Sequence, residues 1–298
     1  MTKPTRWEEN NAAKGLRGCA VLLVSVCLAL AAPPLSAQSA ALETARDSWG
    51  RRGAGFEGEW APSEPIREAI ESLDRALEEA PGELDLYERL MRALYYQGTF
   101  TELTAEERKA VFGRGTEVAT SAVRMLHGTD ELRWKRIEQT VEQVRGVEQA
   151  GPLHYWAAIL WGSWGDHHGA MAALRKGVAD RLRIHGQAAL ELAPDYDFAG
   201  PYRFLGRMHA VAPKVPGFTG WVDRETAVEL LEEGFQRAPE HLQNGLFLAE
   251  IWLEQRPGKK QEALELLERL LAAEPRKGWE VEDSFVLRQV RETAESLE

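Results

Sequence analysis

Three stretches of the chain repeat one spacing: a small residue, a leucine four positions later, a third residue three positions after that, and a proline five positions further on. They are Ala69–Leu73–Ala76–Pro81, Ala227–Leu231–Gly234–Pro239 and Ala263–Leu267–Leu270–Pro275. Offsets of four and three place the first three positions on one face of a helix. Proline ends the helix because it lacks a backbone N–H. Helices that recur in this way indicate a helical-repeat protein, whose usual work is to bind a partner.

Helical patterns also fill the rest of the chain, and no segment shows the sustained alternation of a β-strand. Thr104 and Glu107 form the signature of a capping box, while Gly113 and Gly115 predict a break in the helix that follows. Ser63 is the expected N-cap of the first repeat helix. The sequence predicts an all-α chain with a short helix near residues 41–49 and further helices over residues 65–80, 84–97, 104–126, 131–149, 151–164, 170–194, 198–211, 242–255, 261–273 and 284–298.

The N-terminus has the order of an export signal. A polar start with Lys14 and Arg17 leads into an apolar run, Cys19–Ala32, and then into small residues that end at Ala37. The run is shorter than the roughly 20 residues of a comfortable membrane span, although a retained anchor is the alternative. A lipoprotein signal requires small residues immediately before a cysteine, and Cys27 follows Val24, Ser25 and Val26, which fit that signal poorly. We therefore expect a periplasmic or secreted protein that is cleaved after Ala37.

The composition of the chain that would remain after cleavage excludes several classes of site and partner. Both cysteines lie within residues 1–37, so the exported chain would contain no disulfide, thiolate metal site or cysteine nucleophile. That segment also holds four of the 36 basic and two of the 47 acidic residues, and its removal leaves a net charge of −13. Such an acidic chain repels phosphate, which argues against a nucleic-acid partner. We expect an irregular segment over residues 38–62 and a repeat domain with an irregular middle and a C-terminal capping helix over residues 63–298.

The repeats resemble the tetratricopeptide repeat, a pair of helices called A and B. The resemblance implies a superhelical α–α solenoid in which the A helices line a concave face. The A-helix positions of that motif correspond to Tyr202, Leu205, Gly206 and His209, to Tyr87, Leu90, Met91 and Leu94, and to Gly245, Leu248, Ala249 and Trp252.

As a whole, the chain is similar to the T component associated with TRAP (tripartite ATP-independent periplasmic) transporters. The similarity rests on the order of several segments, namely residues 151–158 (GPLHYWAA), 161–164 (WGSW), 200–206 (GPYRFLG), the Pro/Gly-rich loop to Gly220, and 247–250 (FLAE). It implies an exported helical-repeat protein that partners a solute-binding protein of the transporter and can form homo-oligomers with a central channel.

The register of the A helices selects candidate binding residues. With Tyr202 as the large early residue, Arg203 and Arg207 point into the groove, four positions apart on one helix face. Guanidinium groups beside tyrosine hydroxyls suit a carboxylate, either of a small organic acid or of a peptide terminus. The alternative is ordinary ion pairing, since the chain is rich in Glu and Asp. The same register in the earlier repeat selects Arg92, Tyr95 and Tyr96.

Two tryptophans in the middle of the chain allow opposite interpretations. If Trp156 is the packing residue of its helix, Trp161 and Trp164 face the groove and form a surface for an apolar ligand. If Trp161-Gly162 instead takes the Leu-Gly position, Trp161 is buried between helices. Burial in the core is the default, because aromatic rings bury large apolar areas.

Catalytic motifs are weak in this chain. Asp166, His167 and His168, with His154, offer a metal-dependent enzyme as an alternative, but adjacent histidines on a turn point in different directions and no HExxH motif is present. We expect no catalytic residue, metal or cofactor. The sequence favours a non-enzymatic adaptor that binds a solute-binding protein, with a generic scaffold for envelope assembly as the second hypothesis.

Overall fold

A computed structural model describes residues 35–132 and 136–297 of the chain. The expected signal peptide lies outside these residues apart from its last three, which begin the first helix. Within the described residues no β-strand forms, and the one bridge of strand type joins Ala61 to Thr101. The protein is an all-α helical-repeat solenoid, as the periodicity predicts.

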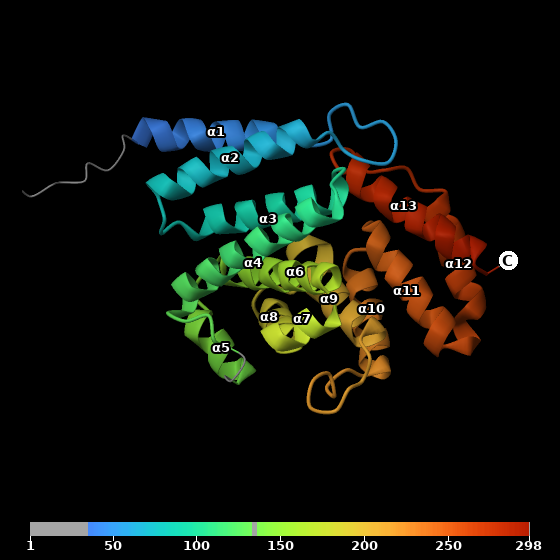
Figure 1. Ribbon diagram of the computed structural model, residues 1–298. Coiled ribbons are helices and arrows are strands. Elements are labelled where there is room, and N and C mark those ends of the chain that lie inside the picture. Colours follow the sequence, from blue (N-terminus) through green and yellow to red (C-terminus); the bar gives the residue numbers. More distant parts are fainter. Residues whose placement is uncertain (1–34, 133–135, 298) are drawn as a thin grey trace, which may run out of the picture. The chain divides into compact units, whose positions relative to one another are not determined.

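The helices follow one another as antiparallel pairs (Figure 1). In chain order these are α1 (Leu35–Gly50) with α2 (Ser63–Glu79), α3 (Leu84–Phe100) with α4 (Ala105–His127), α6 (Ala150–His168) with α8 (Val178–Leu192), α9 (Tyr196–Val211) with α10 (Arg224–Arg237), and α11 (Leu242–Gln255) with α12 (Lys260–Leu271). The short helices α5 (Ile137–Val144), α7 (Ala170–Lys176) and η1 (Pro257–Lys259) lie between them, and α13 (Glu280–Glu295) ends the array.

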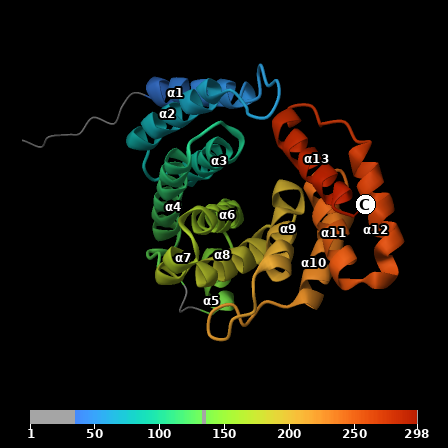
Figure 2. The same cartoon turned by 45° about the vertical axis from the view of Figure 1, so that its right-hand side comes forward.

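The first helices of successive pairs contact one another. We call α3, α6, α9, α11 and α13 the inner row, because each contacts the next and α13 also contacts α3. Both views place α13 beside the loop that joins α1 to α2 (Figure 2). The row therefore closes on itself, which the repeat pattern does not predict.

Closure is made by contacts between residues that are more than 180 positions apart in the sequence. Arg52, in the loop after α1, donates to Glu282 Oε1 through Nε (3.0 Å) and Nη2 (2.8 Å), and to the carbonyl of Gly278 (2.6 Å). Phe100 and Phe285 meet edge to face with ring centroids 5.4 Å apart. Because the Arg52 and Glu282 side chains are only 8% and 15% exposed, this is a buried ion pair.

The two glycines of α4 do not break that helix. It runs without interruption from Ala105 to His127. A Cβ added at Gly115 would lie 2.6 Å from Cδ2 of Leu160, so the absence of a side chain lets α4 approach α6 closely. Gly115, which the sequence suggests as a helix breaker, instead allows two helices to pack closely.

Several predicted boundaries in the irregular parts are different in the structure. The helix expected over residues 131–149 is described only as α5, and the turn expected over residues 165–169 is helical up to His168. The helix expected over residues 170–194 is divided at Gly177, which has a φ of 62°. In the segment expected to be irregular, residues 38–62, the helix expected near residues 41–49 is part of α1, which packs on α2, and a loop follows from residue 51 to residue 62.

The capping box at the start of α4 is confirmed. The Thr104 side chain accepts from the Glu107 N–H (3.3 Å), and the Glu107 carboxylate accepts from the Thr104 N–H (2.8 Å). We expect Thr104→Ala to lower the free energy of unfolding by about 1 kcal/mol. Urea denaturation measures it, with Ser63→Ala as the control: Pro62 is the N-cap of α2, without a side-chain cap bond, so this variant should be unchanged. Equal losses in both variants would contradict the assignment.

Candidate functional site

Three consecutive residues at the start of α9 adopt the left-handed conformation. Asp197, Phe198 and Ala199 have φ values of 50°, 56° and 57°. This conformation is costly for residues with a Cβ and persists only where surrounding contacts fix it. The turn lies in the inner row, at the junction of α6, α9 and α11.

Arg203 fixes the turn. Its Nη1 donates to the Phe198 carbonyl (3.1 Å) and to Asn244 Oδ1 (2.9 Å), and its Nη2 donates to Asp197 Oδ2 (2.8 Å) and the Tyr155 hydroxyl (3.1 Å). The side chain is 6% exposed. Burial acts against the charge, but Tyr155 and Asp197 outweigh it and raise the pKa of Arg203. Sequence reasoning places Arg203 in an open groove; the structure instead buries it in an ion pair, as in the alternative interpretation.

A second polar chain joins three inner helices. Trp156 Nε1 on α6 donates to the Tyr196 hydroxyl (2.8 Å), which donates to Glu88 Oε1 on α3 (2.5 Å). Burial raises the pKa of Glu88, and the hydrogen bond from Tyr196 opposes that shift. The inner row is thus held by polar contacts as well as by apolar packing.

Arg207 also has a partner. It forms an ion pair with Glu250 of α11, and its Cζ lies 4.4 Å from the ring centroid of Phe247. Glu250 in turn accepts from Thr293 Oγ1 of α13 (3.3 Å). Arg207 is therefore a partly exposed link between α9 and α11.

The two tyrosines predicted beside Arg92 are placed differently from each other. Tyr96 is 1% exposed and donates to the Arg52 carbonyl (3.2 Å), so it belongs to the core and not to a groove. Tyr95 is partly exposed and packs against Trp156, with ring centroids 5.6 Å apart. The repeat register alone does not tell which of these two adjacent tyrosines is buried, because other helices pack on both sides of α3.

Arg92 lies between two indoles. Its Cζ is 4.7 Å from the ring centroid of Trp49 and 5.4 Å from that of Trp279. Within the described part of the chain, no hydrogen bond and no ion pair is formed by this guanidinium, which is partly exposed. It is the predicted residue whose surroundings best suit an external ligand.

Trp161 and Trp164 take the core position. They are 6% and 9% exposed, and both belong to the apolar cluster around α6. The Arg181 guanidinium lies over Trp161, with its Cζ 4.5 Å from the centroid, and His168 stacks on Trp164 at 4.1 Å. The register that would turn them toward a groove is wrong, because α4 and α8 cover both sides of α6.

The residues of the metal-enzyme alternative do not come together. Asp166, His167 and His168 lie in the last turn of α6, and His154 lies in its first turns, about 18 Å away at 1.5 Å per residue. His167 instead stacks on Phe112, with ring centroids 5.0 Å apart. Over residues 35–132 and 136–297, no group of three or more His, Cys, Asp or Glu side chains is arranged to hold a metal ion.

His154 belongs instead to a row of three buried histidines that sequence reasoning missed. His127 Nε2 on α4 lies 3.0 Å from His154 Nε2, and His154 Nδ1 lies 2.8 Å from His185 Nδ1 on α8. Burial lowers the pKa of His185 to about 3, with nearby Arg181 adding to the shift. Burial also lowers the pKa of His154, followed by the effects of His185 and His127. No local sequence pattern identifies this row, because its three members come from different helices, α4, α6 and α8.

Acid should therefore destabilise the protein through this row. Unfolded histidine has a pKa near 6.5, so below about pH 6.5 the unfolded chain binds more protons than the folded chain. The stability that depends on neutral His154 and His185 is complete above about pH 7 and is lost as the pH falls toward 3. Each of the two contributes a loss of at most about 1.4 kcal/mol per pH unit. Urea denaturation from pH 7 to pH 4 should show a shallower pH dependence for His185→Gln. An unchanged slope would contradict the prediction.

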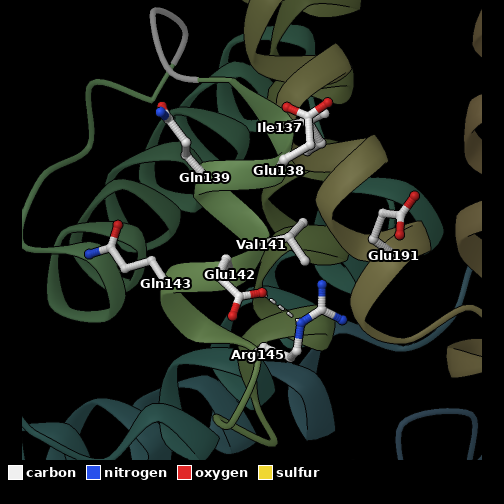
Figure 3. Close-up of a pocket in the computed structure, with 8 residues that line it drawn as sticks. All are labelled: Ile137, Glu138, Gln139, Val141, Glu142, Gln143, Arg145 and Glu191. Carbon is white, nitrogen blue, oxygen red and sulfur yellow. Dashed lines mark hydrogen bonds and ion pairs between the residues drawn. The ribbon is translucent and has the colours of Figure 1, made fainter.

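A separate hollow lies over α5 and the end of α8 (Figure 3). It has a volume of about 660 Å³, an apolar floor that includes Val141, and a rim that includes Glu138 and Glu191. Arg145 on the same rim is bound to Glu142 (3.0 Å). None of the predicted site residues lines this hollow, so it is not the predicted site.

No protein-family model and no curated protein sequence matches the chain. A search of solved structures finds similarity to the crystal structure of yeast Tom70, with a TM-score of 0.28 and 13% sequence identity. The match covers 87% of this chain, which spans about 65% of the length of the Tom70 chain. A similarity at this level carries no argument about function. Within the described residues, no helix combines the length and apolar character that crossing a bilayer requires.

Proposed function

We propose that this protein is an exported, non-enzymatic adaptor that binds a protein partner. The observation that carries the proposal is the array of helix pairs with its inner row. In such arrays each helix pair is held by packing against the next pair, and the side chains of the inner row form a fixed wall that can recognise a partner. The wall is rigid here, since the polar contacts of Arg203 and Tyr196 tie α3, α6, α9 and α11 together. A fixed surface reduces the entropy lost when a partner binds.

The partner that we propose is a solute-binding protein of a TRAP transporter, as the sequence resemblance implies. Of the segments that carry the resemblance, residues 151–158 and 161–164 lie in α6, 200–206 in α9 and 247–250 in α11, all in the inner row, and the Pro/Gly-rich loop follows α9. A Cβ added at Gly200 would lie 2.7 Å from the Tyr155 ring, and one at Gly206 would lie 2.6 Å from Leu231 Cγ. These segments thus set the spacing of neighbouring helices. The resemblance therefore supports the shape of the array, and the identity of the partner is the part that we propose. The homo-oligomer and the generic envelope scaffold stay as alternatives.

Affinity capture from envelope extract tests the proposal. The tagged full-length chain, cross-linked in its own cells, should enrich a solute-binding protein, and the purified pair should bind in calorimetry. Enrichment of envelope-assembly proteins alone would favour the scaffold and contradict the transporter partner. The matched control is Arg203→Gln, which should disturb the inner row and reduce capture.

Export is tested separately by N-terminal sequencing of the chain recovered from the envelope. The proposal expects a chain that begins at Gln38. An intact start at Met1 in the membrane fraction would instead show a retained anchor, and recovery from the cytoplasm would contradict export.

A further inference from the structure

The arginines around the closure of the array differ in their partners. Among the described residues Arg288 has no carboxylate partner, but it donates to the carbonyl of Glu59 (3.1 Å). Those that have a carboxylate partner are Arg52 with Glu282 (2.8 Å), Arg203 with Asp197 (2.8 Å) and Arg276 with Asp283 (2.7 Å). In the described part of the chain Arg92 has no such partner, although acidic residues outnumber basic ones, 47 to 36. Ordinary ion pairing therefore accounts for the three paired arginines and not for Arg92.

Arg92 acts electrostatically on two carboxylates, Glu88 and Glu282, and both are hydrogen-bonded to other groups. Glu88, one turn earlier on α3, accepts from the Tyr196 hydroxyl (2.5 Å), and Glu282 accepts two hydrogen bonds from Arg52. Neither comes within ion-pair distance of Arg92. Contact with Trp49 and Trp279 restrains the planar guanidinium while leaving the N–H groups on its edge able to donate.

Two further polar atoms near the same place lack partners. Arg276 Nη1 is buried without a hydrogen-bond acceptor among the described residues, and the Cζ of this residue lies 5.2 Å from the Trp279 centroid. His241 is 8% exposed, and its Nδ1 is also buried without a partner. Both side chains contact the Phe198 ring, Arg276 at 5.0 Å and His241 at 5.5 Å. Buried polar atoms without partners are rare, and each calls for an explanation such as a bound group.

We propose that Arg92 binds the carboxylate of a ligand whose apolar part packs against Trp49 and Trp279. Charge-assisted hydrogen bonds from guanidinium to carboxylate are among the stronger ones in proteins. The site combines α1, α3 and the segment before α13, so it is complete only when the array is closed. Ligand binding should therefore stabilise closure. This site goes beyond the proposed adaptor function, because it needs no protein partner.

Calorimetry on the full-length chain tests the site with phenylacetate, succinate and a short peptide with a free C-terminus. The proposal expects saturable binding of at least one probe, and no binding of the matching amide, phenylacetamide, succinamide or the amidated peptide. Binding of a small acid alone identifies an organic acid as the ligand, and binding of the peptide alone identifies a chain terminus. No binding at millimolar concentration, or equal binding of the amides, would overturn the proposal.

Matched variants locate the binding. Arg92→Gln should weaken it at least about tenfold, the effect of losing a charge-assisted hydrogen bond. Arg89→Gln, on the same helix but paired with Asp85, should leave it unchanged. Glu282→Gln should also weaken it, because this variant disturbs closure while Arg92 remains. Circular dichroism of each variant confirms folding. Unchanged affinity in folded Arg92→Gln would overturn the proposal even if the adaptor function holds, and capture of the protein partner tests that function independently.

Discussion

Replacement of Arg203 by glutamine is expected to lower the free energy of unfolding by about 3–5 kcal/mol, the usual cost of removing one partner from a buried ion pair. Asp197 would keep a largely buried charge, and the Phe198 carbonyl and Asn244 would each lose a donor. The left-handed turn at residues 197–199 would also lose the contacts that offset its strain. Urea denaturation at pH 7 measures the change.

Arg207→Gln is the matched control for this prediction. Arg207 lies one turn further along α9 and its ion pair with Glu250 is partly exposed, so its replacement should cost about 0–1 kcal/mol. Similar losses in the two variants would show that Arg203 has no special role in the inner row.

Replacement of Arg52 by glutamine is expected to cost about 3–5 kcal/mol as well, for a different reason. This variant leaves Glu282 buried without its cation and removes a donor from the Gly278 carbonyl. Burial already raises the pKa of Glu282 and Arg52 opposes that rise, so the pKa of Glu282 should rise further in the variant. Amide hydrogen exchange in α13 should become faster than in α6, because α13 loses its contact with the start of the array.

The control for Arg52 is its neighbour. Arg51 is exposed and pairs with Asp47 and Glu68 on the surface, so Arg51→Gln should cause no measurable change in stability. Uniformly faster exchange in α6 and α13 of Arg52→Gln would contradict a local role in closure and indicate general destabilisation.

The helix pairs could be predicted from the sequence because they depend on local rules. The spacing of Ala69, Leu73 and Ala76 corresponds to a buried face of α2, and Thr104 and Glu107 form the cap that their types predict. The ends of helices were less predictable. Gly165 predicts the end of a helix but does not end α6, so Asp166 and the two histidines after it extend this helix to its C-cap, Gly169.

The candidate site was less predictable, because it depends on contacts between distant residues. The repeat register identifies Arg92 and Arg207 as equivalent, yet Arg92 lies between indoles contributed by α1 and the segment before α13, whereas Arg207 pairs with Glu250 of α11. The histidine row escapes local patterns for the same reason, since its members come from α4, α6 and α8. Only the closed packing of the helices distinguishes these environments.

A double-mutant cycle on Arg52 and Glu282 tests closure of the array most directly. The free energy of unfolding is measured for the parent chain, for Arg52→Gln, for Glu282→Gln and for the double variant. Because these side chains meet only when α13 returns to the start of the array, we predict a coupling of about 1–3 kcal/mol between residues 230 positions apart. A coupling that does not differ from zero would show that the first and last elements do not meet in solution.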